Sequence, residues 1–130
     1  MAAPAGVKPP VPLVDLLDPG LLRAVRLWQR WLADERRCSP HTCDAYARDL
    51  EAFLRFLSGH LGGAPRLADL DALKLADFRA WLARLSGSGR MRTSTARALS
   101  VVRGFFSWLE RNDLAANHAI RALRTPKIPH

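Results

Sequence analysis

Hydrophobic residues recur every three or four positions along most of the chain, which is the period of an amphipathic helix. The pattern covers residues 21–37, 40–58, 73–85 and 93–111, and a shorter version covers residues 117–124. We find no stretch in which apolar and polar residues alternate as in a half-buried strand. The sequence therefore predicts an all-α fold, a bundle of four main helices with a short C-terminal helix.

Helix-breaking residues divide the pattern into elements. Ser39 followed by Pro40 is typical of an N-cap with proline at the first helical position. Glycines and Pro65 end that helix, and a short turn at residues 67–70 leads into the next one. The Ser-Gly-Ser-Gly segment at residues 86–89 predicts a flexible loop.

The N-terminal residues have a different composition from the rest of the chain. Five prolines occur up to Pro19, so we expect residues 1–19 to form an extended tail with little regular structure. The folded domain is then expected over residues 20–125. Residues 126–130, which hold two more prolines, are expected to begin a linker.

Length and composition restrict the class of protein. The 130 residues suit one domain, and 48% apolar with 25% charged residues is ordinary for a globular protein. No apolar run reaches the length of a membrane span, and the first residues lack the pattern of a signal peptide. We therefore expect a cytoplasmic protein with no membrane partner.

The charge of the chain is strongly basic and unevenly placed. Twenty Lys and Arg residues, seventeen of them arginines, face twelve Asp and Glu residues, which leaves a net charge of +8. Residues 78–109 contain no acidic residue at all, but they contain six arginines: Arg79, Arg84, Arg90, Arg92, Arg97 and Arg103. A run of one sign suits a polyanion, although a solvated basic face without a partner would have the same composition.

Two predicted helix starts are rich in hydroxyl residues. The first groups Ser39, His41 and Thr42, and the second combines hydroxyls with arginines: Arg90, Arg92, Thr93, Ser94, Thr95 and Arg97. Free backbone N–H groups and the helix dipole make such starts suitable for phosphate oxygens. For Ser39 alone, we favour an ordinary N-cap over a DNA contact.

Residues for catalysis or metal binding are not assembled in the sequence. Cys38, His41 and Cys43 could offer three ligands, but a fourth is missing nearby. Tyr46, the only tyrosine, falls on the apolar side of its helix, where a packing role is expected rather than a nucleophilic one. We therefore predict no catalytic residue, no metal site and no cofactor within this chain.

Two blocks of sequence resemble a known family. Residues 39–50 (SPHTCDAYARDL) and residues 95–106 (TARALSVVRGFF) resemble the N-terminal DNA-binding domain of tyrosine recombinases, most closely the bacterial Xer group of XerC- and XerD-like proteins. Residues 117–129 resemble the family's lead into the interdomain linker. His118 departs from the pattern, because the family usually has proline at that position.

The resemblance implies a SAM-like core-binding domain that clamps double-stranded DNA at a recombination half-site. Catalysis would belong to a second domain outside these residues, so this chain is not expected to cut DNA itself. The parent enzyme would act with partner subunits in a tetramer on DNA, in chromosome dimer resolution and segregation at cell division. Carried over by position, the DNA contacts would be Ser39, His41, Thr42, Arg48, Arg92, Thr93, Thr95, Arg97, Ser100 and Arg103.

Two alternative interpretations stay open. The same domain occurs in phage, integron and transposon integrases, which have other targets. A non-enzymatic helical module could instead dock a protein through an aromatic face made of its four tryptophans: Trp28, Trp31, Trp81 and Trp108.

Overall fold

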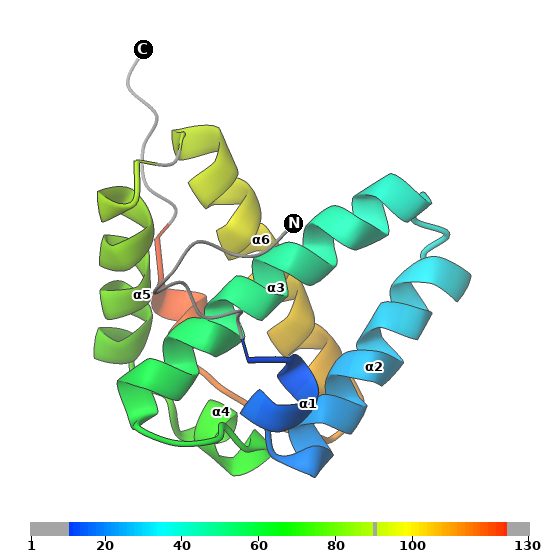
Figure 1. Ribbon diagram of the computed structural model, residues 1–130, viewed down its shortest axis with the longest axis horizontal. Helices are drawn as coiled ribbons and strands as arrows, with labels where there is room; N and C mark the ends of the chain where they lie inside the picture. Colours follow the sequence, from blue (N-terminus) through cyan, green and yellow to red (C-terminus); the bar gives the residue numbers. More distant parts are fainter. Residues whose placement is uncertain (1–10, 90, 125–130) are drawn as a thin grey trace, which may run out of the picture.

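The computed structural model describes residues 11–89 and 91–124, and within these residues the fold is all-α, as predicted (Figure 1). The helices are α1 (Leu13–Leu16), α2 (Pro19–Asp34), α3 (Pro40–Leu61), α4 (Leu67–Ala72), α5 (Leu75–Gly87), α6 (Arg92–Arg111) and a 3-10 turn, η1 (Ala119–Ala122). The expected linker, the first part of the expected tail and Arg90 lie outside the described residues. In the described part, no helix is both long and apolar enough to cross a membrane.

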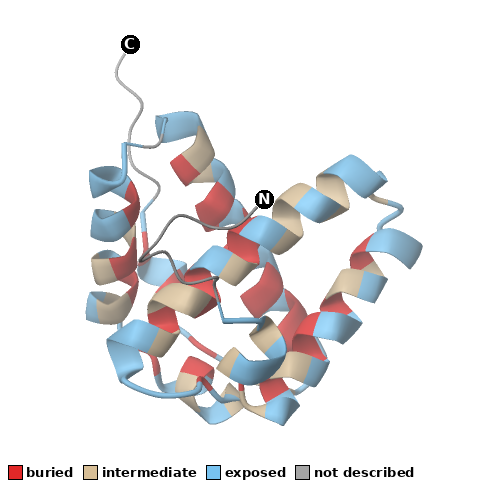
Figure 2. Cartoon of the chain, viewed as in Figure 1, coloured by how far each residue is buried: buried red, intermediate tan, exposed pale blue. Residues whose placement is uncertain are grey.

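The centre of the fold is the crossing of α3 and α6, which make the most extensive contact in the molecule. Figure 1 shows α3 passing diagonally over α6, with α5 along one flank and α2 along the other. Phe53 of α3 is fully buried at this crossing, where its ring packs edge-on against Trp81 of α5 at 4.9 Å and Phe106 of α6 at 6.1 Å between centroids. In Figure 2 the buried positions accordingly line the inward faces of the helices.

The second part of the core lies between α2 and α6. Trp28 meets Phe105 in an edge-to-face contact with centroids 5.3 Å apart. Trp28, Trp81 and Trp108 are each at most 5% exposed, and only Trp31 is half-buried. The interpretation of the tryptophans as one docking face is therefore wrong, because three of them are needed inside.

Regular structure begins earlier in the chain than we expected. Residues 13–16 form the short helix α1, and Leu17 is buried in the core. Asp18 then caps α2 by accepting a hydrogen bond from the Gly20 N–H at 3.0 Å, with Pro19 at the first helical position. The apolar residues in this proline-rich stretch thus gain enough burial against α2 and α3 to order it.

The predicted turn at residues 67–70 is the short helix α4, and the third predicted helix is α5, which begins at Leu75 rather than at residue 73. Leu73 is extended, and α5 starts anew after Lys74, whose backbone N–H donates to Asp77 Oδ2 at 2.7 Å. The final predicted helix is also shorter than expected, a single 3-10 turn. Asn117 holds that turn in place: its buried Nδ2 donates to the carbonyls of Leu70 and Leu73 at 2.8 and 2.9 Å.

Candidate nucleic-acid interface

The start of α3 is capped by its own hydroxyl residues. Ser39 Oγ accepts a hydrogen bond from the Thr42 backbone N–H at 3.2 Å and lies 3.0 Å from Thr42 Oγ1, to which it donates. Ser39 and His41 are exposed, and Thr42 is half-buried. Ser39 is thus an N-cap, and its neighbours present polar groups to solvent around the first helical turn.

The start of α6 has no side-chain cap. Its N-cap residue is Met91, which is 72% exposed and makes no side-chain capping bond. Arg92 and Thr93 are exposed in the first turn. A helix start whose N-cap side chain makes no capping bond suits an anion, because backbone N–H groups and the helix dipole face it.

Thr95 does not belong to this exposed set. It is 4% exposed, and its Oγ1 donates to the Met91 carbonyl at 3.4 Å. A phosphate cannot reach a hydroxyl buried in this way, so the structure gives Thr95 a packing role.

Arg97 forms an ion pair with Asp49 across the crossing of α3 and α6. Arg97 Nε lies 2.8 Å from Asp49 Oδ2, and Nη2 lies 3.3 Å from Oδ1. Asp49 is only 3% exposed, whereas the Arg97 side chain is 49% exposed. The hydrogen bond to Asp49, reinforced by the carboxylate charge, raises the pKa of Arg97 above its ordinary value. Arg97 thus neutralises a buried acid while part of its guanidinium faces solvent.

Arg103 also makes an internal contact. Its Nη2 donates to the backbone carbonyl of Leu123, which ties α6 to the segment after η1. The residue is half-buried. Arg103 thus supports the fold in a way that its place in the acid-free run did not reveal.

The structure brings several of the predicted contacts toward one edge. In Figure 1 the starts of α3 and α6 both point to the upper edge of the molecule, on either side of the crossing. The exposed predicted residues are Ser39, His41, Arg48, Arg92, Thr93, Arg97 and Ser100. Arg97 and Ser100 also line a groove of about 330 Å³ between α2, α3 and α6.

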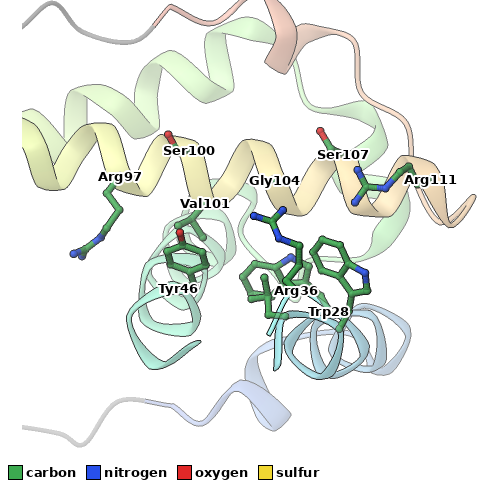
Figure 3. A pocket seen from close by; sticks show the side chains of 11 residues that line it. Trp28, Arg36, Tyr46, Arg97, Ser100, Val101, Gly104, Ser107 and Arg111 are labelled. Carbon is green, nitrogen blue, oxygen red and sulfur yellow. The ribbon is translucent and has the colours of Figure 1, made fainter. Parts of the chain in front are cut away.

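The groove contains residues that the sequence analysis did not single out. Figure 3 shows Arg36, which follows α2, reaching toward Gly104 of α6, while Arg111 lies at the far end of the same helix. The guanidinium carbons of Arg36 and Arg111 lie 5.6 and 5.4 Å from the centroid of the Trp31 ring. No motif marks this group: Arg36 lies five residues after Trp31, and Arg111 lies 75 residues further along the chain.

The inward position of Asp49 and its need for a cation partner could have been predicted from the sequence. It falls between Tyr46, Leu50 and Phe53, on the side of α3 that turns inward. A carboxylate on an apolar helix face needs a cation partner, and the acid-free run supplies arginines for that purpose. The sequence alone could not say which arginine.

The two cysteines are free thiols at the start of α3. Cys43 Sγ lies 3.6 Å from the Cys38 carbonyl oxygen, and both residues are half-buried. Desolvation, with the nearby Cys38 and Asp44, raises the pKa of the Cys43 thiol. A thiol held protonated in this way is a poor metal ligand and a poor nucleophile.

Comparison with known proteins identifies the class of the domain. Residues 25–113 match the family described as "Phage integrase, N-terminal SAM-like domain". The match covers α3, α5 and α6 with the greater part of α2, and so includes the helix crossing and both helix starts. The chain belongs to this family, and the resemblance to the core-binding domain of tyrosine recombinases is confirmed.

Two similar proteins carry the same name within that class. The chain is 43% identical over 127 residues to "Tyrosine recombinase XerC" of Rhizobium meliloti (strain 1021), covering 95% of the chain and 40% of that protein. It is 44% identical over 110 residues to the protein of the same name from Rhodospirillum centenum, covering 85% of the chain and 32% of the relative. The chain thus spans less than half the length of these relatives. No solved structure matches it significantly.

Proposed function

We propose that this domain is the DNA-binding, core-binding part of a XerC-like site-specific tyrosine recombinase. The observation that carries the proposal is the common edge at which α3 and α6 begin, with exposed hydroxyl and arginine side chains. Most of these groups would contact backbone phosphates and set the register of the domain on the duplex, while few would read bases. The relatives named XerC support the same assignment.

The whole protein would be an enzyme with a second, catalytic domain. By the family resemblance, it would act with partner subunits in a tetramer on DNA, in the cytoplasm, and would serve chromosome dimer resolution and segregation at cell division. Phage, integron and transposon integrases share the domain, but the relatives named XerC favour the Xer group over them.

The test is binding of the 130-residue chain to a labelled duplex, measured by fluorescence anisotropy across a salt series. One duplex carries a chromosome-dimer-resolution site and the other a scrambled sequence. We expect binding that weakens steeply with salt, with a slope of about −0.9 per phosphate contacted, and a preference for the site. Equal binding to both duplexes would restrict the domain to backbone contacts, and absence of binding at low salt would contradict the proposal.

Single variants locate the interface on the surface. Arg48→Ala removes an exposed arginine of α3 from the predicted contact set. We expect it to weaken binding to both duplexes and to reduce the salt slope by about 1. Arg23→Ala, an exposed arginine of α2 outside that set, is the matched control and should change neither quantity.

A further inference from the structure

The groove between α2, α3 and α6 contains an unusual concentration of cationic groups. Two guanidinium groups, those of Arg36 and Arg111, approach the same indole ring at 5.6 and 5.4 Å. Among residues 11–89 and 91–124, neither forms an ion pair with a carboxylate. Two positive charges held on one ring repel each other, and an anion between them would remove that repulsion.

The acidic residues close to these arginines in sequence form no ion pair with them in the described part of the chain: Asp34, Glu35, Glu110 and Asp113. Glu110, the neighbour of Arg111, pairs with Arg121 instead. At the other end of the groove, Arg97 is already neutralised by Asp49. The uncompensated positive charge of the groove is therefore concentrated at the end formed by Arg36 and Arg111.

The floor of this end is open and polar. Gly104 and Ser107 of α6 line it, and both are exposed. A Cβ atom added at Gly104 would meet no atom within 4 Å. The site thus combines two guanidinium forks with free space over Gly104, which is the chemistry that binds a phosphate.

The site is continuous with the surface assigned to DNA. Arg97 and Arg111 lie fourteen residues apart on one helix, or about 21 Å at the helical rise. That length corresponds to the rise of about six base pairs of B-DNA. A duplex that contacts the upper edge and lies along the polar side of α6 would bring a second set of phosphates to the groove.

We infer that Arg36 and Arg111, with Trp31 as the platform beneath their guanidinium groups, bind a backbone phosphate of the same duplex that contacts the starts of α3 and α6. The inference rests on the proposed function and extends the interface to the C-terminal end of α6. The contact is with phosphate, so it adds affinity equally for any sequence.

The experiment compares variants of the 130-residue chain by anisotropy on the site duplex and the scrambled duplex. We expect Arg36→Ala and Arg111→Ala each to weaken binding about three- to tenfold at low salt on both duplexes, and the two together to reduce the salt slope by about 1. Arg30→Ala, an exposed arginine of α2 outside the groove, is the matched control and should bind like the unchanged chain. Thermal unfolding of each variant monitors the fold.

A second pair of variants blocks the groove without removing an arginine. Gly104→Glu places a carboxylate in the open space between the guanidinium groups, and we expect it to weaken binding at least as much as the arginine variants do. Gly104→Ala should leave binding unchanged, because its Cβ meets nothing. Normal DNA binding by each of the three variants Arg36→Ala, Arg111→Ala and Gly104→Glu would overturn the inference and leave the proposed function intact.

Competition by inorganic phosphate at constant ionic strength distinguishes a groove that binds the DNA backbone from a groove that binds only free phosphate. If the groove serves the DNA backbone, phosphate should compete with the duplex for the unchanged chain and less so for the Arg36→Ala/Arg111→Ala double variant. Competition by phosphate that is equal for both proteins would overturn the assignment of the groove. Failure of the unchanged chain to bind any duplex would instead contradict the proposed function.

Discussion

The carboxylate of Asp49 is almost fully buried, and the guanidinium of Arg97 forms an ion pair with it. Arg97→Ala removes two charge-assisted hydrogen bonds to this buried carboxylate, so we expect it to lower the free energy of unfolding by about 1–3 kcal/mol. Because the guanidinium is half exposed, we expect a smaller loss of stability than for a fully buried ion pair. Urea unfolding measures it. The double variant Asp49→Leu/Arg97→Met should recover most of the stability; equal instability of the double and single variants would show that the pair is not the cause.

The same pair limits how much charge Arg97 can offer to DNA. Asp49→Asn keeps a hydrogen-bonding side chain but removes the negative charge beside the guanidinium. We expect this variant to bind duplex DNA more tightly at low salt and with a steeper salt dependence, because Arg97 gains an uncompensated charge. Anisotropy across a salt series checks it. Unchanged affinity and slope would place Arg97 outside the interface.

Asp77 links stability to acidic pH. The Lys74 backbone N–H and the His60 side chain, whose Nε2 lies 2.8 Å from Asp77 Oδ1, hold the pKa of Asp77 below its ordinary value. A carboxylate with a lowered folded-state pKa stabilises the fold above its unfolded pKa of about 4, and this contribution disappears as pH falls through the folded-state value. We expect Asp77→Asn to cost about 1 kcal/mol at pH 7 and much less at pH 2–3. Thermal unfolding at both pH values measures the difference, and an equal loss at both would exclude the charge as the cause.

At the level of elements, the cap of α3 separates a structural from a DNA-binding role. Ser39 Oγ accepts a hydrogen bond from the Thr42 N–H, so Ser39→Ala should destabilise the domain by about 1 kcal/mol. Thr42→Ala keeps that bond and removes only the Thr42 hydroxyl, so we expect weaker DNA binding with little loss of stability. Urea unfolding and anisotropy on both variants give the comparison. Normal affinity of Thr42→Ala would remove this hydroxyl from the interface.

The helices that the sequence predicted well are those with a strong apolar period and a clear start. For α3 the Ser39–Pro40 pair fixes the first residue, and the end extends only three residues past the predicted 58, to Leu61. The predicted turn at residues 67–70 is the helix α4 instead, and the next helix begins two residues later than predicted, because the cap that Asp77 forms with the Lys74 N–H does not show in the apolar spacing. Likewise η1 depends on Asn117 reaching carbonyls more than forty residues away in sequence.

The candidate site was predictable in part, for a related reason. Local sequence is enough to predict that polar residues at helix starts are exposed, and Ser39, His41 and Thr93 are exposed in the structure. The partners of arginines do not follow from local sequence. The bond from Arg103 to Leu123 and the meeting of Arg36 with Arg111 at Trp31 are products of the tertiary fold.

For the whole molecule, the net charge of +8 makes DNA a stabilising ligand under the proposed function. A duplex at about 100 times its dissociation constant should add about 2.7 kcal/mol to the free energy of unfolding, which is roughly 8–13 °C in melting temperature for a domain of this size. Differential scanning calorimetry at low salt measures the shift. The same mixture in about 1 M salt, where charges are screened beyond about 3 Å, is the control and should show almost none. A shift that persists in high salt would contradict an electrostatic interface.

Because the tryptophans are unequally buried, the intrinsic fluorescence of the domain can report on the groove. Three indoles lie in the core and should emit at short wavelength, inaccessible to a dissolved quencher, whereas Trp31 is half-exposed beside the two guanidinium groups. Acrylamide should therefore quench a minor, red-shifted part of the fluorescence that Trp31→Phe abolishes. Occupation of the groove would then be visible as protection of this single fluorophore, without any label on the protein.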